Sequence, residues 1–218
     1  MSVDAMFHMM LIETGRTMYM TVVGTLGSYA IGLPLGILLS ITDKDGIIPN
    51  PAFNWGLGTF INLMRAVPFL IMVVIMYPVP RFLIGTSLGY KATTIMLIIA
   101  AFAFVARIVE TSIKEVDKGV IEAARSMGSS AVQIICKVLV PEARSSLVLG
   151  AAISATTILA YSAMAGILGG QGLGFVAISY GWYRYQRDIM WIAVILLTML
   201  VIIGQYFGNL IARKVDKR

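Results

Sequence analysis

The sequence predicts an all-α membrane protein that crosses the bilayer several times. Of its 218 residues, 58% are hydrophobic and 13% are charged, whereas a soluble domain usually has about 25% charged residues. Three long stretches carry no charged side chain, namely residues 17–42, 145–183 and 189–212. Each is long enough for a membrane-spanning helix, which needs roughly 20 mostly apolar residues.

Taken in order, the apolar stretches predict five spanning helices in a single domain, residues 1–218. Pro68 should kink the second helix. In the first helix, Gly32 and Gly36 flank Pro34, a pattern that favours close helix packing and a kink. The expected spans are residues 18–41, 57–77, 92–112, 145–166 and 189–212.

The uneven distribution of Lys and Arg predicts the orientation, because cytoplasmic loops are enriched in these residues. With the N-terminus outside, five basic residues lie outside: Arg16, Arg81, Lys91, Arg184 and Arg187. Ten then lie inside: Lys44, Lys114, Lys118, Arg125, Lys137, Arg144, Arg213, Lys214, Lys217 and Arg218. We therefore expect an outer N-terminus and a cytoplasmic C-terminus. The net charge of +6 follows from these loops, and no nucleic-acid partner is inferred.

Several chemistries are excluded by what the sequence lacks. A single cysteine, Cys136, and a single histidine, His8, allow neither an internal disulfide nor a Cys/His metal cluster. No Gly-x-x-x-x-Gly-Lys-Ser/Thr loop is present to hold a nucleotide. A proton-coupled carrier would need carboxylates within the membrane. Only Glu110 is expected near a span, where Arg107 three residues earlier should pair with it.

Residues 113–144, between the third and fourth spans, are too polar to span and too helical for a plain linker. Asp117 can cap a short helix, and Gly128 can end it. Ser130 and Gln133 form a capping box for a second helix, and Pro141 can start the next span. The first helix has a polar face of Lys118, Glu122, Arg125 and Ser129, and an apolar face of Val120, Ala123, Ala124 and Met127. Such a helix is a solvated connector, an interfacial helix or a helix that docks into a partner's groove.

One motif in this segment resembles the EAA motif of bacterial ABC importer permeases. Glu122, Ala123 and Ala124 are followed by three residues, Gly128, nine residues and then the Val-Leu-Val-Pro run 138–141. The family pattern has Ile and Leu at the first and third positions of that run, so both departures are apolar exchanges. In that family the motif forms the coupling helix that docks into the ATPase subunit. The resemblance assigns this role to Glu122, Ala123, Ala124, Arg125, Met127 and Gly128.

Further segments are similar to permeases of the methionine-uptake type, namely residues 65–69, 85–89, 106–110, 161–164 and 169–174. The resemblance implies a homodimer in the bacterial inner membrane, with two ATPase subunits and an extracytoplasmic substrate-binding protein. ATP and magnesium would bind the ATPase, and this chain would bind no cofactor. The alternatives are a permease for another amino acid or a small peptide and, from another class, a stand-alone carrier or channel.

Polar residues of the fourth span are candidates for the translocation pathway. The ring of Tyr161 and the thioether of Met164 lie one turn apart and could contact an apolar amino-acid side chain. By resemblance the pathway set is Thr157, Tyr161, Ser162 and Met164. Ordinary packing between helices would explain the same residues. The glycine run 169–174 should allow tight turning at the outer mouth, as a plain flexible loop or as a gate or contact for a binding protein. Arg65 either snorkels to the headgroups or makes a buried polar contact.

Overall fold

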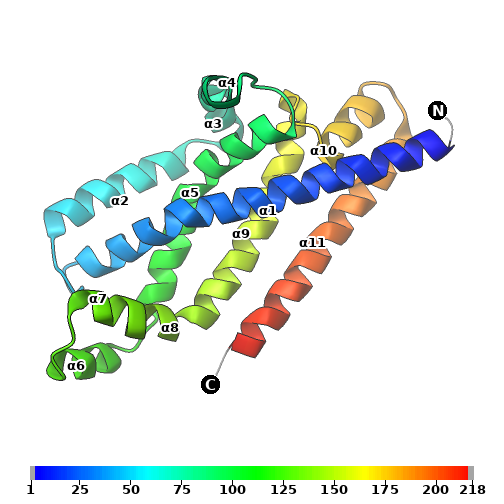
Figure 1. Ribbon diagram of the computed structural model, residues 1–218. Helices are drawn as coiled ribbons and strands as arrows, with labels where there is room; N and C mark the ends of the chain where they lie inside the picture. The colour runs from blue at the N-terminus through cyan, green and yellow to red at the C-terminus, as the bar shows by residue number, and fades with distance from the viewer. Residues whose placement is uncertain (1–2, 216–218) are drawn as a thin grey trace.

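The computed structural model describes residues 3–215, and over this range the protein is all-helical, with no strand (Figure 1). Lys217 and Arg218, counted above for the orientation, lie outside the described residues. Four described helices are long and apolar enough to cross a membrane. They are α1 (Val3–Thr42), α5 (Tyr90–Lys114), α9 (Arg144–Ala165) and α11 (Arg187–Val215). The last three begin and end within a few residues of the expected spans.

The expected second span is a broken helix. α2 (Pro51–Ala66) and α3 (Phe69–Met76) meet at Val67 and Pro68 with a bend of 100°. Proline has no N–H and disfavours a helical residue before it, so the break falls where the sequence predicted a kink, but it is much sharper. If α2 and α3 count as one span, the chain has up to five.

The first helix, α1, begins at Val3 and is 40 residues long, so it extends 15 residues beyond the expected start of the first span at residue 18. Glu13 and Arg16 lie in this additional part of the helix, where Arg16 Nη1 and Glu13 Oε1 form an ion pair at 2.5 Å. The helix also runs through Pro34 without interruption.

The predicted close packing of the first helix is confirmed, and its partner is α5. A Cβ added to Gly32 would lie 2.8 Å from the carbonyl oxygen of Phe102, and one added to Gly36 would overlap that of Ala106. Both glycines are therefore required for the close approach of the two backbones.

Short helices close the bundle at both ends (Figure 1). One end carries α4 (Pro78–Ile84) and, later in the chain, the 3-10 turn η2 (Gly166–Leu168), α10 (Leu173–Val176) and the π-helical turn η3 (Ala177–Trp182). The other end carries α6 (Lys118–Ser126), α7 (Ala131–Ile134), the π-helical turn η1 (Ile135–Leu139) and α8 (Val140–Glu142). We refer to these as the α10 end and the α6 end.

The described chain starts at the α10 end and finishes at the α6 end (Figure 1). Met10 of α1 packs in a core cluster with Leu173 and Val176. At the opposite end, Ser145 Oγ donates a hydrogen bond to the Ala212 carbonyl at 3.4 Å. Opposite ends for the two termini agree with an odd number of membrane crossings.

Candidate functional site

The helix that carries the EAA residues, α6, is fixed by its own sequence. Asp117 caps it, since its Oδ1 accepts a hydrogen bond from the Gly119 amide at 2.6 Å. Gly128, with φ +76°, follows the C-cap residue Met127, and the Ser129 amide donates back to the Ala124 carbonyl at 3.1 Å. This left-handed turn ends the helix where glycine is favoured. Both predicted caps are confirmed.

The second short helix, α7, has the predicted capping box. Gln133 N donates to Ser130 Oγ at 3.4 Å, and Ser130 N donates to Gln133 Oε1 at 2.8 Å. The chain continues through η1, which exposes Cys136, and Pro141 then lies in the first turn of α8. α9 begins three residues after Pro141, at Arg144. From Lys118 to Glu142 the chain is therefore helical, apart from the turn at Gly128 that separates α6 from α7.

The orientation of α6 differs from the predicted division into a polar and an apolar face. Ala124 is 4% exposed and packs in a core cluster with Ile134 and Leu139, whereas Ala123 is exposed and Met127 is 79% exposed. The reason is that α6 packs on the bundle through the side that carries Ala124 and the half-buried Ile121. The exposed side of α6 and its C-terminal turn comprises Val120, Glu122, Ala123 and Met127.

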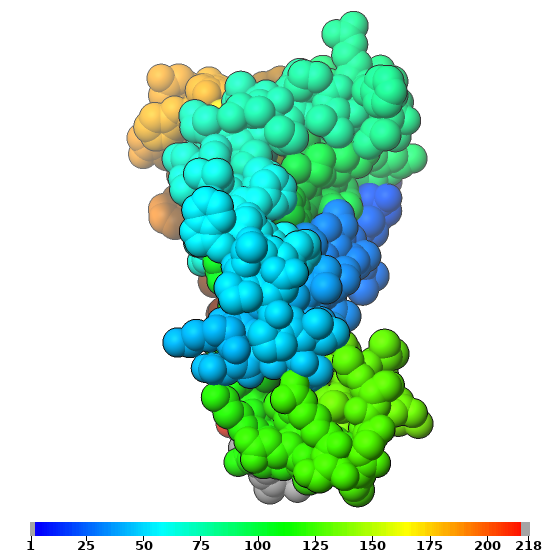
Figure 2. Space-filling model, turned by 90° about the vertical axis from the view of Figure 1, so that its left-hand side faces the viewer, coloured from blue at the N-terminus to red at the C-terminus, as the bar shows by residue number. Residues whose placement is uncertain are grey.

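The α1–α2 loop holds α6 in place from the side. Arg125 Nη2 donates to the carbonyl oxygens of Ile47 at 2.8 Å and Gly46 at 3.3 Å. A cleft of about 300 Å³ lies between this loop and α6. In the side view of Figure 2 the segment that contains α6 protrudes as the lowest part of the molecule, directly below the end of α1. The loop and α6 therefore form one exposed surface.

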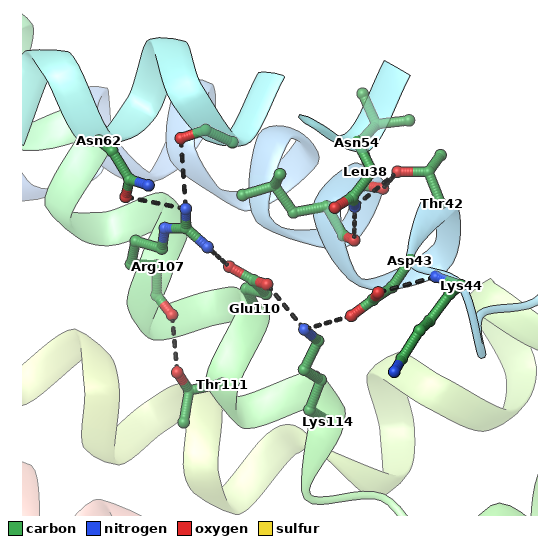
Figure 3. Close-up of polar contacts among 12 residues, drawn as sticks. Leu38, Thr42, Asp43, Lys44, Asn54, Asn62, Arg107, Glu110, Thr111 and Lys114 are labelled. Atoms are coloured by element: carbon green, nitrogen blue, oxygen red, sulfur yellow. Dashed lines mark hydrogen bonds and ion pairs between the residues drawn. The ribbon is translucent and has the colours of Figure 1, made fainter. Parts of the chain in front are cut away.

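A chain of polar contacts leads from this surface into the bundle (Figure 3). Lys114 Nζ lies 2.6 Å from Asp43 Oδ2 and 2.9 Å from Glu110 Oε1. Glu110 Oε2 pairs with Arg107 Nη1 at 2.5 Å, which confirms the expected ion pair. Arg107 Nη2 reaches Asn62 Oδ1 of α2 at 2.9 Å. The two basic and two acidic groups balance, so the cluster adds no net charge to the membrane protein.

Asp43 lies outside the spanning helices, at the exposed end of this chain. Its hydrogen bond with Lys114, together with one from the Lys44 amide, holds the pKa of the Asp43 carboxyl below its ordinary value. The carboxylate therefore stays ionised, and the contact joins the α1–α2 loop to the end of α5.

One face of α9 is left open by the other helices of the chain. Residues spaced three or four apart share a helix face, and Ile153, Thr157 and Met164 follow this spacing. Ile153 is 48% exposed and Met164 is 42% exposed. The half-buried Tyr161 lies on the same side and stacks on Phe69 of α3, with centroids 4.2 Å apart and planes 9° apart. The structure thus brings Thr157, Tyr161 and Met164 together on one face.

Ser162 lies on the opposite face of α9. It is 1% exposed, and its hydroxyl donates to the Leu159 carbonyl of the same helix at 2.7 Å. Its neighbours on that face, Ser154 and Ile158, are also buried. The structure therefore separates Ser162 from the other three predicted pathway residues.

The glycine run at the α10 end is held by contacts that the sequence analysis missed. Glu13 is 7% exposed, and its Oε2 accepts a hydrogen bond from the Gly172 amide at 2.6 Å. The Leu173 amide donates to Thr17 Oγ1 at 2.9 Å. The expectation that Glu110 is the only acidic residue near a span is therefore wrong. The available signal was the run 5–12 before Glu13, which is apolar except for His8, with Arg16 three residues after Glu13.

The run itself forms a tight turn rather than a flexible loop. Gly169 and Gly172 have φ of +82° and +85°, a conformation that favours glycine. The Gly89 amide donates to the Gly169 carbonyl at 3.1 Å, and the Tyr90 amide donates to Gln171 Oε1 at 3.2 Å. The turn is therefore joined to the start of α5 as well as to α1, and α10 follows it directly.

Comparison with known proteins gives consistent findings. The family described as the inner membrane component of binding-protein-dependent transport systems matches residues 32–218. The probable D-methionine transport system permease protein MetI of Vibrio cholerae is 43% identical over 96% of this chain and 93% of its own length. The methionine import system permease protein MetP of Bacillus subtilis is 39% identical over 83% of this chain and 82% of its own length.

Solved structures show the same similarity in three dimensions. A chain of the MetNI methionine ABC transporter, in an inward-facing conformation, aligns with a TM-score of 0.97 and 38% identity, and the alignment covers 100% of both chains. A chain of an amino acid ABC transporter, crystallised with histidines, aligns with a TM-score of 0.70 at 22% identity, which shows a shared fold alone.

Proposed function

Because the chain belongs to the family of inner membrane components of binding-protein-dependent transport systems, we propose that it is the permease subunit of an ATP-driven methionine importer. It forms the pathway through the membrane for methionine, in the L or the D form. The observation that carries the proposal is that its whole length matches the permease chain of a methionine ABC transporter in sequence and fold. The chain itself is not an enzyme.

The working assembly contains two copies of this chain, two ATPase subunits and an extracytoplasmic binding protein. ATP and magnesium bind the ATPase subunits, because this sequence has no phosphate-binding loop. The binding protein delivers methionine to the outer mouth. ATP binding shifts the permease between inward and outward states because the partners contact the two states differently.

The α6 end is the proposed contact with the ATPase, and it would therefore face the cytoplasm. Glu122, Ala123 and Met127 are exposed at its surface, whereas Ala124 packs inward and Arg125 holds the α1–α2 loop. Gly128 supplies the turn that ends α6. The partner thus meets Glu122, Ala123 and Met127, and the other three residues position them. The N-terminus then lies outside and the C-terminus in the cytoplasm of a bacterial inner membrane protein.

The translocation pathway follows the open face of α9. Thr157, Tyr161 and Met164 share that face, and the packed bundle of one chain leaves it accessible. In a dimer, two such faces would enclose a route that no single chain forms. Ser162 is left out of the pathway because it is buried on the other face.

The test is uptake of radiolabelled methionine into proteoliposomes that contain this chain, its ATPase and its binding protein. We expect uptake that requires ATP and is competed by unlabelled methionine. ATP-dependent activity without methionine uptake would indicate another amino acid or a small peptide as cargo. Uptake by this chain without ATP or the ATPase would instead identify a stand-alone carrier.

The coupling role is tested by two substitutions at the α6 end. Glu122→Lys reverses a charge on the exposed surface, and Gly128→Asp places a side chain at φ +76°. Both should reduce ATPase binding and uptake. Lys137→Glu, a charge reversal at another exposed position of the same segment, is the matched control. Normal ATPase binding and uptake in both test variants would refute the coupling role.

A further inference from the structure

A second cleft of about 340 Å³ lies between α2, α5 and α9. Its volume is at the small end of the range for ligand sites, about 300–1,000 Å³. Apolar side chains form part of its wall, and two arginines, Arg65 and Arg107, also line it. Its apolar lining residues are Phe104, Ile108, Leu149 and Ile153.

The two arginines differ in their partners. Arg107 is neutralised by Glu110 and is also bonded to Asn62. Arg65 is exposed at the last turn of α2, and no described residue gives its guanidinium a hydrogen bond or an ion pair. Glu115, whose Oε2 accepts a hydrogen bond from Ser146 Oγ at 2.6 Å, also lines the cleft. The cleft therefore holds one guanidinium without a described partner, together with this carboxylate.

A free arginine on a membrane helix requires a polar environment. Charged residues of membrane proteins face a water-filled cavity or the interior of the bundle, because exposure of the charge to lipid is costly. Arg65 meets this requirement by facing the cleft. Since the break at Val67 and Pro68 ends α2 directly after it, Arg65 also lies in the last helical turn, whose carbonyl groups have no partner within the helix.

The cleft continues the open face of α9. Ser146, Gly150 and Ile153 line the cleft, and Thr157, Tyr161 and Met164 follow at helical spacing on the same side. A molecule that moved along this face toward the α6 end would therefore reach Arg65 and the apolar wall.

We propose that this cleft is a transient cargo site and that Arg65 binds the α-carboxylate of the amino acid there. A guanidinium matches a carboxylate with two parallel hydrogen bonds, and the apolar wall suits an uncharged side chain such as a thioether. The proposal rests on the proposed function, because it assigns a binding step within that transport pathway.

The first test measures the maximal uptake rate in proteoliposomes for Arg65→Gln and Arg65→Lys. Loss of a charged hydrogen-bond partner should slow uptake about tenfold to a hundredfold in Arg65→Gln. Uptake by Arg65→Lys, which keeps the charge but loses the planar guanidinium, should lie between the rates of Arg65→Gln and the wild type. Arg81→Gln, at an exposed position of α4 away from the cleft, is the control and should match the wild type. An uptake rate in Arg65→Gln equal to that of the wild type would overturn the proposal and indicate that Arg65 instead snorkels to the lipid headgroups.

The second test separates recognition of charge from a structural role. Arg65→Cys is made in a Cys136→Ser background, which leaves a single thiol in the chain. The folded permease–ATPase complex is then treated with aminoethyl methanethiosulfonate or with sulfonatoethyl methanethiosulfonate. The cationic adduct should restore part of the uptake and the anionic adduct should not. The Cys136→Ser parent receives the same treatments. Equal effects of the two reagents, or no effect of either, would overturn the proposal.

The two proposals fail in different ways. If the wild-type complex shows no ATP-dependent methionine uptake, the proposed function is wrong. If the wild type transports methionine but the Arg65 variants do so at the same rate, only the carboxylate site is wrong.

Discussion

The two ends of the molecule are built by different kinds of contact. At the α10 end, backbone amides of the glycine run bond to α1, with Gly172 to Glu13 and Leu173 to Thr17, each pair more than 150 residues apart in the sequence. At the α6 end, the caps join neighbours, as Asp117 does with Gly119 and Ser130 with Gln133. Long-range contacts thus hold the first end. At the second, local caps shape α6 and α7, and the contact of Arg125 with Ile47 fixes α6 to the α1–α2 loop.

The difference teaches that the glycine turn of the α10 end is complete within one chain, although Phe82 of α4 and Trp182 of η3 at that end are 90% and 69% exposed. At the α10 end the polar groups of the turn have partners in the same chain, and Leu173 and Val176 are buried. At the α6 end, by contrast, Met127 and Val132 are 79% and 69% exposed. Exposed apolar side chains on a rigid, well-capped segment are typical of a surface that binds a partner. Substitutions in the glycine turn should therefore affect folding, and those on the exposed surface of the α6 end should affect association.

The largest loss of stability is expected for Gly174→Val at the α10 end. A Cβ at Gly174 would overlap the backbone of Ala163 in α9, which cannot move aside as a side chain could. We expect a loss of about 3 kcal/mol or more in the free energy of unfolding, measured by denaturation in mixed micelles. Gly56→Ala in α2, where a Cβ meets no atom within 4 Å, is the control. Equal stability of Gly174→Val and Gly56→Ala would contradict the role of Gly174 in holding the α10 end together.

Glu13→Ala should have the next largest effect. It leaves the Gly172 amide without its acceptor and Arg16 without its ion-pair partner. We expect a loss of about 2 kcal/mol in the free energy of unfolding and faster hydrogen exchange at Gly172. Glu13→Gln keeps an acceptor and should lose less. Unchanged exchange at Gly172 in Glu13→Ala would contradict the contact.

A smaller effect is expected at Asp43, where the α1–α2 loop meets α5. Since Lys114 holds the pKa of Asp43 below its ordinary value of 3.8, the contact stabilises the folded state fully above that value. The contribution is lost as pH falls through the lower pKa of the folded state. An exposed ion pair contributes less than about 1 kcal/mol. Asp43→Asn should therefore be slightly less stable than the wild type at neutral pH and equal to it at strongly acidic pH, by denaturation across pH. A constant difference would contradict the ion pair.

The smallest effect on stability is expected for Met127→Ser at the α6 end. Because the side chain is 79% exposed, the free energy of unfolding should change by no more than about 0.5 kcal/mol. Binding of the ATPase, measured by co-purification or calorimetry, should nevertheless weaken. The buried Ala124→Ser at the same end provides the contrast, since it should lower stability more. Unchanged ATPase binding in Met127→Ser would argue against docking at this surface.

The same contrast explains what the sequence could predict. The caps of α6 and α7 and the turn at Gly128 depend on residues within three or four positions, and these predictions are confirmed. The long apolar helices α5, α9 and α11 were also predicted directly from the composition of the sequence. The face of α6 that packs inward could not be predicted, because burial of Ala124 depends on Ile134, Leu139 and other parts of the bundle.

The early start of α1 and the long-range contacts that hold the glycine run were missed for a physical reason. Glu13 precedes the uncharged stretch 17–42 from which the first span was predicted, and its acceptor role becomes visible only when Gly172 lies beside it. Similarly, Pro68 marks the break between α2 and α3, but the 100° bend depends on what the two helices pack against. Among the candidate site residues, helical spacing could align Tyr161 with Met164, but the burial of Ser162 required the structure.

The length of α1 has a mechanical consequence. Between Glu13 and Thr42 the helix continues without a break, so at 1.5 Å per residue it sets a separation of about 45 Å between the two ends of the molecule. Such a helix resists stretching. When the ends move relative to each other, the strain must be absorbed by softer joints, namely the break at Val67 and Pro68 and the π-helical turns η1 and η3.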